Sequence, residues 1–129
     1  MRSRILVGVL LLVGLSSVGV LANKASYKQW SIINFQDPVV VKDRLVMGPV
    51  LIVHDDLKMA QGQPCTTFYE FDPAKGPGEA IVSFHCRPSK RAAVEQTKLT
   101  LVASPAFPCK RLVEYQIAGE PEAHGIPEK

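Results

Sequence analysis

Residues 64–87 read PCTTFYEFDPAKGPGEAIVSFHCR, and they carry the clearest structural signal in the chain. Two runs rich in β-branched and aromatic residues, 66–72 and 79–86, flank a centre of Pro and Gly that favours tight turns. The stretch therefore predicts a β-hairpin. Folding it symmetrically about its centre places Cys65 opposite Cys86, which predicts a disulfide at the base of the hairpin if the chain reaches an oxidising compartment. A thiolate metal site is the alternative role for the two cysteines.

The same symmetric pairing predicts which side chains of the hairpin are buried, because strand residues alternate between two faces. The more apolar face should point to the core, and Phe68 falls on the opposite face, where another strand covers it or a partner binds it. A slip of two residues would keep these faces. The expected core face consists of Cys65, Thr67, Tyr69, Phe71, Ala80, Val82, Phe84 and Cys86.

The remainder of the chain repeats this alternation of short apolar runs and turn signals. The pattern predicts an all-β domain of about seven short strands, arranged as an antiparallel β-sandwich. Asp55–Gln63 is the segment expected to form a short helix. Residues 88–96 are expected to be a charged crossover, and 119–129 a polar tail that is either disordered or folded back. The runs are 29–35, 39–41, 45–47, 50–54, 66–72, 79–86, 97–103 and 111–118.

The N-terminal 22 residues have the layout of a secretory signal peptide. Arg2 and Arg4 precede an apolar stretch that ends in the small-residue site Val20-Leu21-Ala22. We expect cleavage there, which leaves 23–129 as one exported domain in the periplasm or outside the cell, with no stable membrane span. An uncleaved N-terminal membrane anchor is the alternative, since residues 5–22 are just long enough to cross a bilayer.

The charge balance excludes one class of partner. The 129 residues include 15 Lys and Arg and 12 Asp and Glu, and without Arg2 and Arg4 the balance falls to 13 against 12. Nucleic-acid binding would need basic side chains clustered on one face, so no such partner is expected. The chain has no nucleophile elbow, phosphate loop or dinucleotide fingerprint. We therefore expect a protein that is not an enzyme.

Histidine and cysteine are the residue types that bind copper or zinc. The spacing contains no CxxC, HxH or HExxH motif, and adjacent residues such as His85 and Cys86 point to opposite faces of a regular strand. Asp55 and Asp56 follow the first histidine, where a carboxylate either orients the ring or caps the next segment. The candidate metal ligands are His54, His85 and His124.

Cys109 is the odd cysteine of the chain, between Pro108 and Lys110. An unpaired cysteine in an exported protein is a free thiol or joins another chain. Cys109 is a free thiol if Cys65 and Cys86 pair, and pairing of Cys109 with either of them remains open.

Residues 35–55 read FQDPVVVKDRLVMGPVLIVHD, in which a Phe-x-x-Pro run enters one strand and a Leu-x-x-Gly step opens the next. Together with the later pieces PCTTFY, FHC and AGEPEAHGIP, this stretch resembles an uncharacterised family of small exported bacterial β-domain proteins. The resemblance implies a fold and a compartment, and no established activity.

Two functions follow from the sequence. The first is a non-enzymatic domain of the bacterial envelope that binds another envelope protein, or a second copy of itself, through its surface and needs no cofactor. The alternative is a copper- or zinc-binding or redox protein that uses the histidines and cysteines. Stoichiometric metal would distinguish the second from the first.

Overall fold

The computed structural model describes residues 27–104 and 108–128, so the expected signal peptide or anchor lies outside the described residues. The fold is mostly β, as the sequence predicted. No helix in the described ranges is long and apolar enough to cross a membrane. The elements are β2 (Lys28–Val41), β3 (Arg44–Asp55), α2 (Asp56–Ala60), β4 (Thr66–Asp72), β5 (Gly76–Phe84), β6 (Arg87–Lys90), β7 (Lys98–Val102), β8 (Lys110–Gln116) and β9 (Glu122–Gly125).

The eight strands form one hydrogen-bonded sheet in the order β5-β4-β3-β2-β8-β9-β6, with β7 paired to β8 outside this path. All pairs are antiparallel except β2 and β8, which run parallel over Val39–Val41. The predicted antiparallel sandwich is corrected here to a single mixed sheet. The parallel pair is possible because β3 to β7 lie between β2 and β8 in the chain, and parallel neighbours need a long crossover that a tight turn cannot supply.

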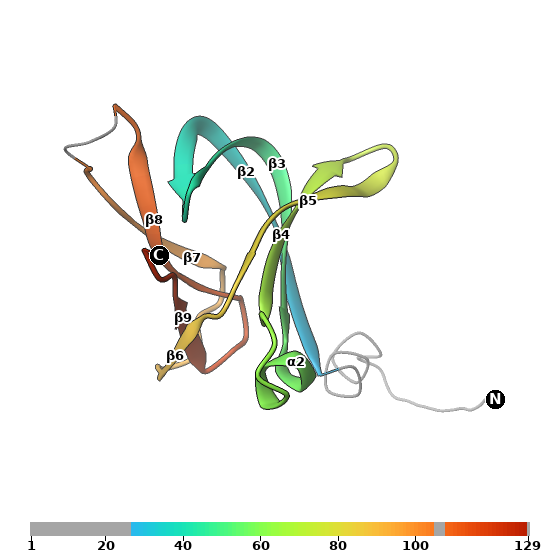
Figure 1. Cartoon of the computed structure of the whole chain (residues 1–129), viewed down its shortest axis with the longest axis vertical. Coiled ribbons are helices and arrows are strands. Elements are labelled where there is room, and N and C mark those ends of the chain that lie inside the picture. Colours follow the sequence, from blue (N-terminus) through green and yellow to red (C-terminus); the bar gives the residue numbers. More distant parts are fainter. Residues whose placement is uncertain (1–26, 105–107, 129) are drawn as a thin grey trace.

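The core lies where the sheet curves back on itself. Figure 1 shows β2 to β5 on one side and β6 to β9 on the other, with the two halves facing each other. The ring of Phe68 from the first half meets the ring of Tyr115 from the second edge-on, with centroids 6.3 Å apart. Buried residues of the first half include Phe35, Val41, Val50, Ile52, Phe68 and Phe84, and those of the second half include Leu112, Tyr115, Ile117 and Ile126.

Two gaps between the predicted runs, at residues 36–38 and 48–49, lie inside strands. The turn expected at residues 36–38 is an irregularity between Phe35 and Val39, after which β2 resumes its pairing with β3. Such a bulge bends a strand without ending it. The break expected at Gly48-Pro49 also lies within β3, where Gly48 adopts a φ of 80° that other residues rarely adopt. The first half of the sheet therefore consists of longer strands than the sequence indicated.

The hairpin forms, but its register differs from the symmetric one. Thr66 pairs with Phe84 and Phe68 with Val82, whereas symmetric folding pairs Thr67 with Phe84. A shift of one residue exchanges the two faces of a strand. The predicted core face is therefore wrong for β4, where Phe68 is fully buried and Tyr69 is not, and right for Phe84. The difference begins at the turn, where Asp72 pairs with Gly76 and not with Glu79, and two irregularities on either side of Tyr69 reverse it only in part.

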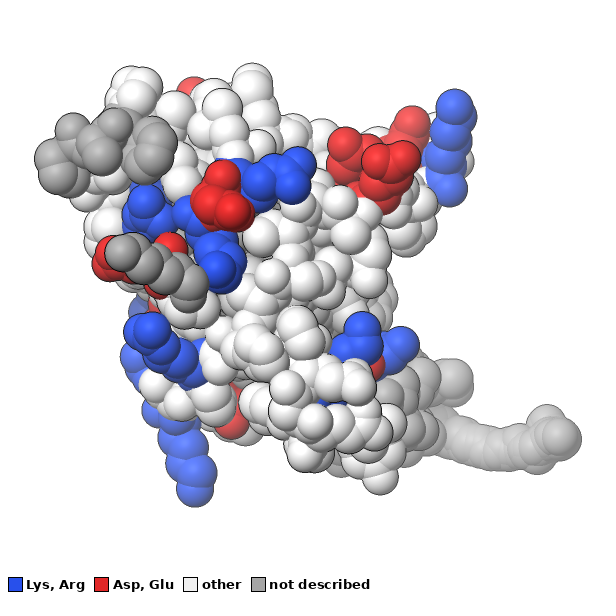
Figure 2. Space-filling view, in the orientation of Figure 1, with Lys and Arg blue, Asp and Glu red and all other residues white. Residues whose placement is uncertain are grey.

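The end of the chain completes the second half of the sheet. Residues 122–125 form β9, which pairs with β6 and β8, so this part of the tail folds back onto the domain. The crossover expected after Cys86 likewise contains β6. On the face shown in Figure 2, the charged side chains lie in a few groups that mix both signs, with uncharged surface between the groups.

Candidate metal centre

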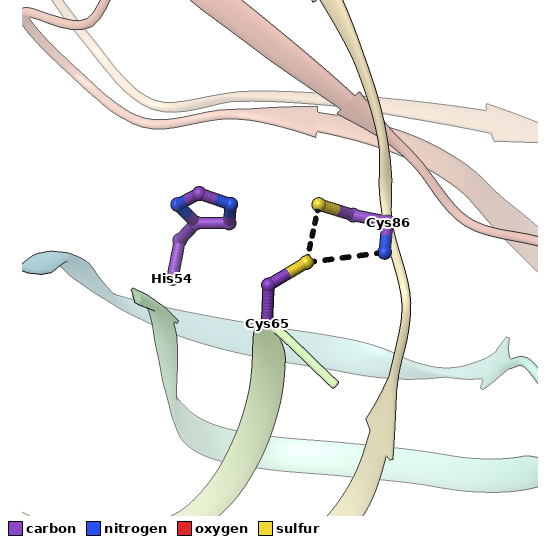
Figure 3. Close-up of side chains that lie close together, drawn as sticks. All are labelled: His54, Cys65 and Cys86. Carbon is purple, nitrogen blue, oxygen red and sulfur yellow. Dashed lines mark hydrogen bonds between the residues drawn. The ribbon is translucent and has the colours of Figure 1, made fainter. Parts of the chain in front are cut away.

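Four His and Cys side chains meet between the two halves of the sheet. His54 lies near the end of β3, Cys65 directly before β4 and Cys86 shortly after β5. The nearest donor atoms of these three residues all lie within 4.8 Å of one another. Figure 3 shows both sulfur atoms beside the His54 ring. His124 reaches the cluster from β9, with its Nδ1 3.5 Å from Cys86 Sγ.

The register of the strands places these residues together. Gln29, His54, Thr66 and Phe84 are successive partners across β2, β3, β4 and β5. Residues that are aligned across a sheet share a face, and His54 and Thr66 are fully buried. Cys65 lies one residue before this row, where its carbonyl oxygen accepts a hydrogen bond of 2.9 Å from the backbone N–H of Asp55.

Two acceptors determine the protonation of the His54 ring. Its Nδ1 lies 2.9 Å from Gln29 Oε1 and 3.2 Å from Asp56 Oδ1. Gln29 Nε2 in turn donates to Asp56 Oδ2 at 3.2 Å. Carboxylate oxygens only accept, so Nδ1 carries the proton and donates it. In the neutral ring, Nε2 then holds a free lone pair.

That lone pair is the unusual feature of the cluster. Within the described part of the chain, His54 Nε2 is the one buried side-chain nitrogen or oxygen without a hydrogen-bond partner. Burying a polar atom without a partner costs free energy. A histidine whose second nitrogen is held by a carboxylate, with the first left bare, is the usual arrangement of a metal ligand.

The aspartate pair after His54 performs both roles that the sequence allowed. Asp55 caps α2, because its Oδ1 accepts hydrogen bonds from the backbone N–H groups of Leu57 and Lys58. Asp56 orients the imidazole ring of His54. The short helix predicted here is therefore present, and it holds the orienting carboxylate in place.

The two cysteines are close together and are free thiols in this structure. Their Sγ atoms are 2.7 Å apart, compared with about 2.05 Å in a disulfide. Cys65 is 3% exposed and Cys86 is half-buried. Burial, followed by the hydrogen bond and charge of Cys65, raises the pKa of Cys86 to about 12. Cys86 therefore keeps its proton at neutral pH until a cation displaces it.

His124 stacks between two other rings and is held neutral. Its ring centroid lies 4.0 Å from that of His54 and 5.0 Å from that of Tyr115. Burial, and then the charge of His54, lower the pKa of His124 to about 3. Burial also lowers the pKa of His54, against the opposing charges of Asp56 and Asp55. Both rings are thus in the neutral form that binds metals.

The same protonation states argue against a cysteine hydrolase. Cys86, His124 and Glu122 form a series, since His124 Nε2 lies 3.8 Å from Glu122 Oε1. A catalytic pair needs a thiolate and an imidazolium, which requires a lowered thiol pKa. Here the pKa of the thiol is raised and that of the imidazole is lowered.

Acidic side chains surround the His end of the cluster. Burial raises the pKa values of Glu120 and Glu122, and the negative charge of Asp56 raises both further. Asp56 Oδ1 lies 3.2 Å from His54 Nδ1, and Glu122 Oε1 lies 3.8 Å from His124 Nε2, so each histidine of the cluster has a carboxylate beside it. Such a group creates a negative potential that attracts cations.

The other predicted site residues lie elsewhere. His85 is exposed, and it lines a surface hollow together with Pro64 and Arg87. Cys109 precedes β8 and lines a different hollow beside Asp37. The structure thus brings Cys65, Cys86, His54 and His124 together. His85 lines the surface hollow that also includes Cys86, and neither His85 nor Cys109 belongs to the cluster.

Sequence reasoning missed three residues that support the cluster. Gln29 orients His54, and Thr66 Oγ1 and Tyr115 Oη share a buried hydrogen bond of 2.5 Å beside it. These residues could have been identified as polar side chains at buried strand positions, but only the correct register shows which positions are buried. The wrong register assigned Thr66 to the outer face, which removed this signal.

Comparison of the chain with known protein families, with characterised proteins and with solved structures found no match. The geometry of the cluster therefore carries the functional argument alone.

Proposed function

We propose that this protein binds a soft d¹⁰ metal ion, zinc(II) or copper(I), through His54, Cys65 and Cys86, with His124 as a fourth ligand. The observation that carries the proposal is the bare, buried Nε2 of His54, which lies with two thiols inside one 4.8 Å cluster. A bound metal would supply the partner that this nitrogen lacks. The sequence suggested metal binding as the alternative function. We now favour it over the first hypothesis, a domain that acts through its surface alone.

The donor types favour a soft metal. Thiolate and imidazole suit zinc and copper(I), whereas calcium and magnesium need oxygen ligands. The carboxylate of Asp56 lies behind the His54 ring and holds its Nδ1. Two histidines and two cysteines would complete a tetrahedral site of the kind that zinc prefers. Sulfur atoms in such a site are about 3.8 Å apart, given bonds of about 2.3 Å, so the thiols would separate slightly on binding.

A metal here would join the two halves of the sheet. His54 comes from β3 in the first half, and His124 comes from β9 in the second. Only the folded chain gathers these ligands, so binding stabilises the folded state. We therefore infer a site that is closed and structural or that carries metal as cargo, and a function without catalysis.

The test uses the reduced full-length protein and cobalt(II), which reports tetrahedral thiolate coordination by its visible and near-ultraviolet absorption. We expect one cobalt per chain, displaced by zinc. Cys65→Ser and His54→Gln should abolish the thiolate bands or weaken binding at least tenfold. Cys109→Ser and His85→Gln are matched controls that change the same residue types outside the cluster. Binding that is absent, or that the control variants reduce equally, would overturn the proposal.

His124 distinguishes the two metals. Zinc(II) prefers four ligands, so His124→Gln should weaken zinc binding at least tenfold. Copper(I) is satisfied by fewer soft ligands, and the same change should alter copper(I) affinity by less than about threefold if thiolates dominate its binding. Competition against a chromogenic chelator for each metal measures both affinities.

The compartment and the partners are part of the proposal. A signal peptide in residues 1–22, export to the periplasm or cell exterior, and membership of a family of small exported bacterial β-domains remain predictions from the sequence. An uncleaved anchor remains the alternative. Contact with another envelope protein, or self-association, remains a prediction as well, and the intact mass of the exported protein would establish where its chain begins.

A further inference from the structure

The two thiols of the candidate centre are close enough either to form a disulfide with each other or to bind one metal ion together. Their sulfurs are 2.7 Å apart, between the separation of about 2.05 Å in a disulfide and about 3.8 Å in a zinc bis-thiolate. The backbone N–H of Cys86 also donates to Cys65 Sγ at 3.2 Å, which holds the residues together. Both residues lie outside the regular strands, where small backbone adjustments are least restricted.

We propose that Cys65 and Cys86 form a reversible dithiol–disulfide couple, so that oxidation of the pair and binding of the metal exclude each other. This inference rests on the proposed metal site and adds its regulation. In the reduced state, the thiolates, His54 and His124 hold the ion. In the oxidised state, the sulfurs are bonded to each other and only the two imidazoles remain as ligands.

The exchange of the couple with a low-molecular-weight disulfide, RSSR, balances without any other reactant. The Cys86 thiol first gives up its proton to solvent, the resulting thiolate attacks one sulfur of RSSR, and RS⁻ leaves. Cys65 Sγ, as its thiolate, then attacks Cys86 Sγ in the mixed disulfide and displaces the second RS⁻. The two protein thiols lose two electrons to RSSR and their two protons to the products, which gives one disulfide and two RSH. From the metal-bound state, the ion leaves with its charge unchanged.

The different exposure of the two cysteines determines which thiol reacts with the external disulfide first. Cys86 is half-buried and lines a surface hollow with Ser83 and His85, whereas Cys65 is 3% exposed. An external disulfide therefore reaches Cys86 first. Cys65 is the resolving thiol, because it lies against Cys86 and is shielded from competing reagents.

Cys109 provides an internal control for the pairing. It precedes β8, and Tyr115, which packs against the cluster, lies six residues further along the chain. Six strand residues span about 20 Å, which is far beyond the reach of a disulfide. Oxidation should therefore leave the Cys109 thiol free to react with an alkylating reagent.

The experiment equilibrates the full-length protein with reduced and oxidised glutathione at several ratios, traps thiols by alkylation, and measures disulfide by peptide mass. Without metal, we expect a Cys65–Cys86 disulfide and a free Cys109. With zinc at about 100 times its dissociation constant, the concentration of oxidised glutathione divided by the square of that of reduced glutathione should rise about 100-fold at half-oxidation, because only the reduced form is stabilised. Oxidised protein should show no cobalt bands until it is reduced.

A variant separates failure of this inference from failure of the metal site. His54→Gln keeps both thiols, so its disulfide should form as in the unchanged protein while the zinc-dependent shift is lost. If reduced protein binds cobalt but the pair resists oxidation, or oxidised protein keeps its metal, the switch is wrong and the metal site stands. If reduced protein binds no metal, the proposed function fails and the metal-gated switch fails with it.

Discussion

At one end of the first half of the sheet, polar side chains are buried on the inner face and apolar side chains are exposed on the outer face. On the inner face, His54 and Thr66 are fully buried. On the outer face, Trp30 is 55% exposed and Ile32 is 45% exposed. Apolar atoms form more than half of an ordinary protein surface, so the outer face by itself assigns nothing. A buried histidine nitrogen without a partner is rare, and it is the anomaly that requires a functional explanation.

The largest effect should separate the two faces directly. Phe68→Ala removes a ring that is fully buried between the sheet halves, and should lower the free energy of unfolding by about 3–5 kcal/mol. Tyr69→Ala, its neighbour on the outer face, should cost less than about 1.5 kcal/mol because the ring is only partly buried. Urea unfolding of both variants measures the difference. Equal losses would show that the strand faces are not as described.

This pair of residues also marks the limit of prediction from sequence. The mostly-β class, the hairpin and the short helix followed from periodicity and turn chemistry, which are local. The face of β4 did not, because a tighter turn that pairs Asp72 with Gly76 and two irregularities near Tyr69 together leave the register one residue from the symmetric one. Where a bulge falls depends on packing against β3, and a sequence pattern carries no such information.

The candidate site was predictable in part for the same reason. Cys65 and Cys86 come together because they flank one hairpin, so symmetric folding was enough to pair them. His54 was singled out by its neighbouring aspartates. His124 lies on β9, and its approach depends on long-range pairing of β8 with β9. The sequence therefore left open whether the tail would bring His124 to the cluster.

The second prediction concerns the stability that a metal bound at the inner face adds to the folded protein. Zinc at about 100 times its dissociation constant should raise the free energy of unfolding by about 2.7 kcal/mol, since the unfolded chain does not gather the ligands. A chelator should reverse the gain, and His54→Gln should abolish it. Thermal unfolding with and without zinc measures the effect. A gain of the same size in His54→Gln would assign the zinc to another place.

The third prediction tests the carboxylate that holds the His54 ring. Asp56→Asn keeps the size of the side chain, but it weakens the acceptor for Nδ1–H and so the basicity of Nε2. We expect metal affinity to fall about 10- to 100-fold, as for other carboxylate partners of ligating histidines. The matched control is Asp72→Asn in the hairpin turn, where the carboxylate accepts only backbone hydrogen bonds from Ala74 and Lys75. Equal effects of the two changes would mean that Asp56 acts only through overall charge.

The smallest expected effect is a slope of stability with pH in the metal-free protein. The pKa of His124 is lowered from 6.5 to about 3, and that of His54 is also lowered, in both cases chiefly by burial. Below pH 6.5 the unfolded chain takes up protons that the folded rings refuse, so stability is full above this pH and declines as the pH falls toward the folded pKa values. The decline should be at most about 1.4 kcal/mol per pH unit for each histidine.

Near pH 5, Glu120 and Glu122 act in the opposite direction, because their folded pKa values are raised above 4.5 and the folded state binds the extra protons. The change of stability with pH that the two histidines cause is therefore measured between pH 6.5 and about 5.5. His124→Gln should reduce this slope by up to half, and His85→Gln, at an exposed histidine, should leave it unchanged. Urea unfolding at several pH values measures slopes independently of any constant loss of stability. A flat profile in the unchanged protein would mean that both inner-face rings accept protons in the folded state, which a buried histidine pair with centroids 4.0 Å apart should resist.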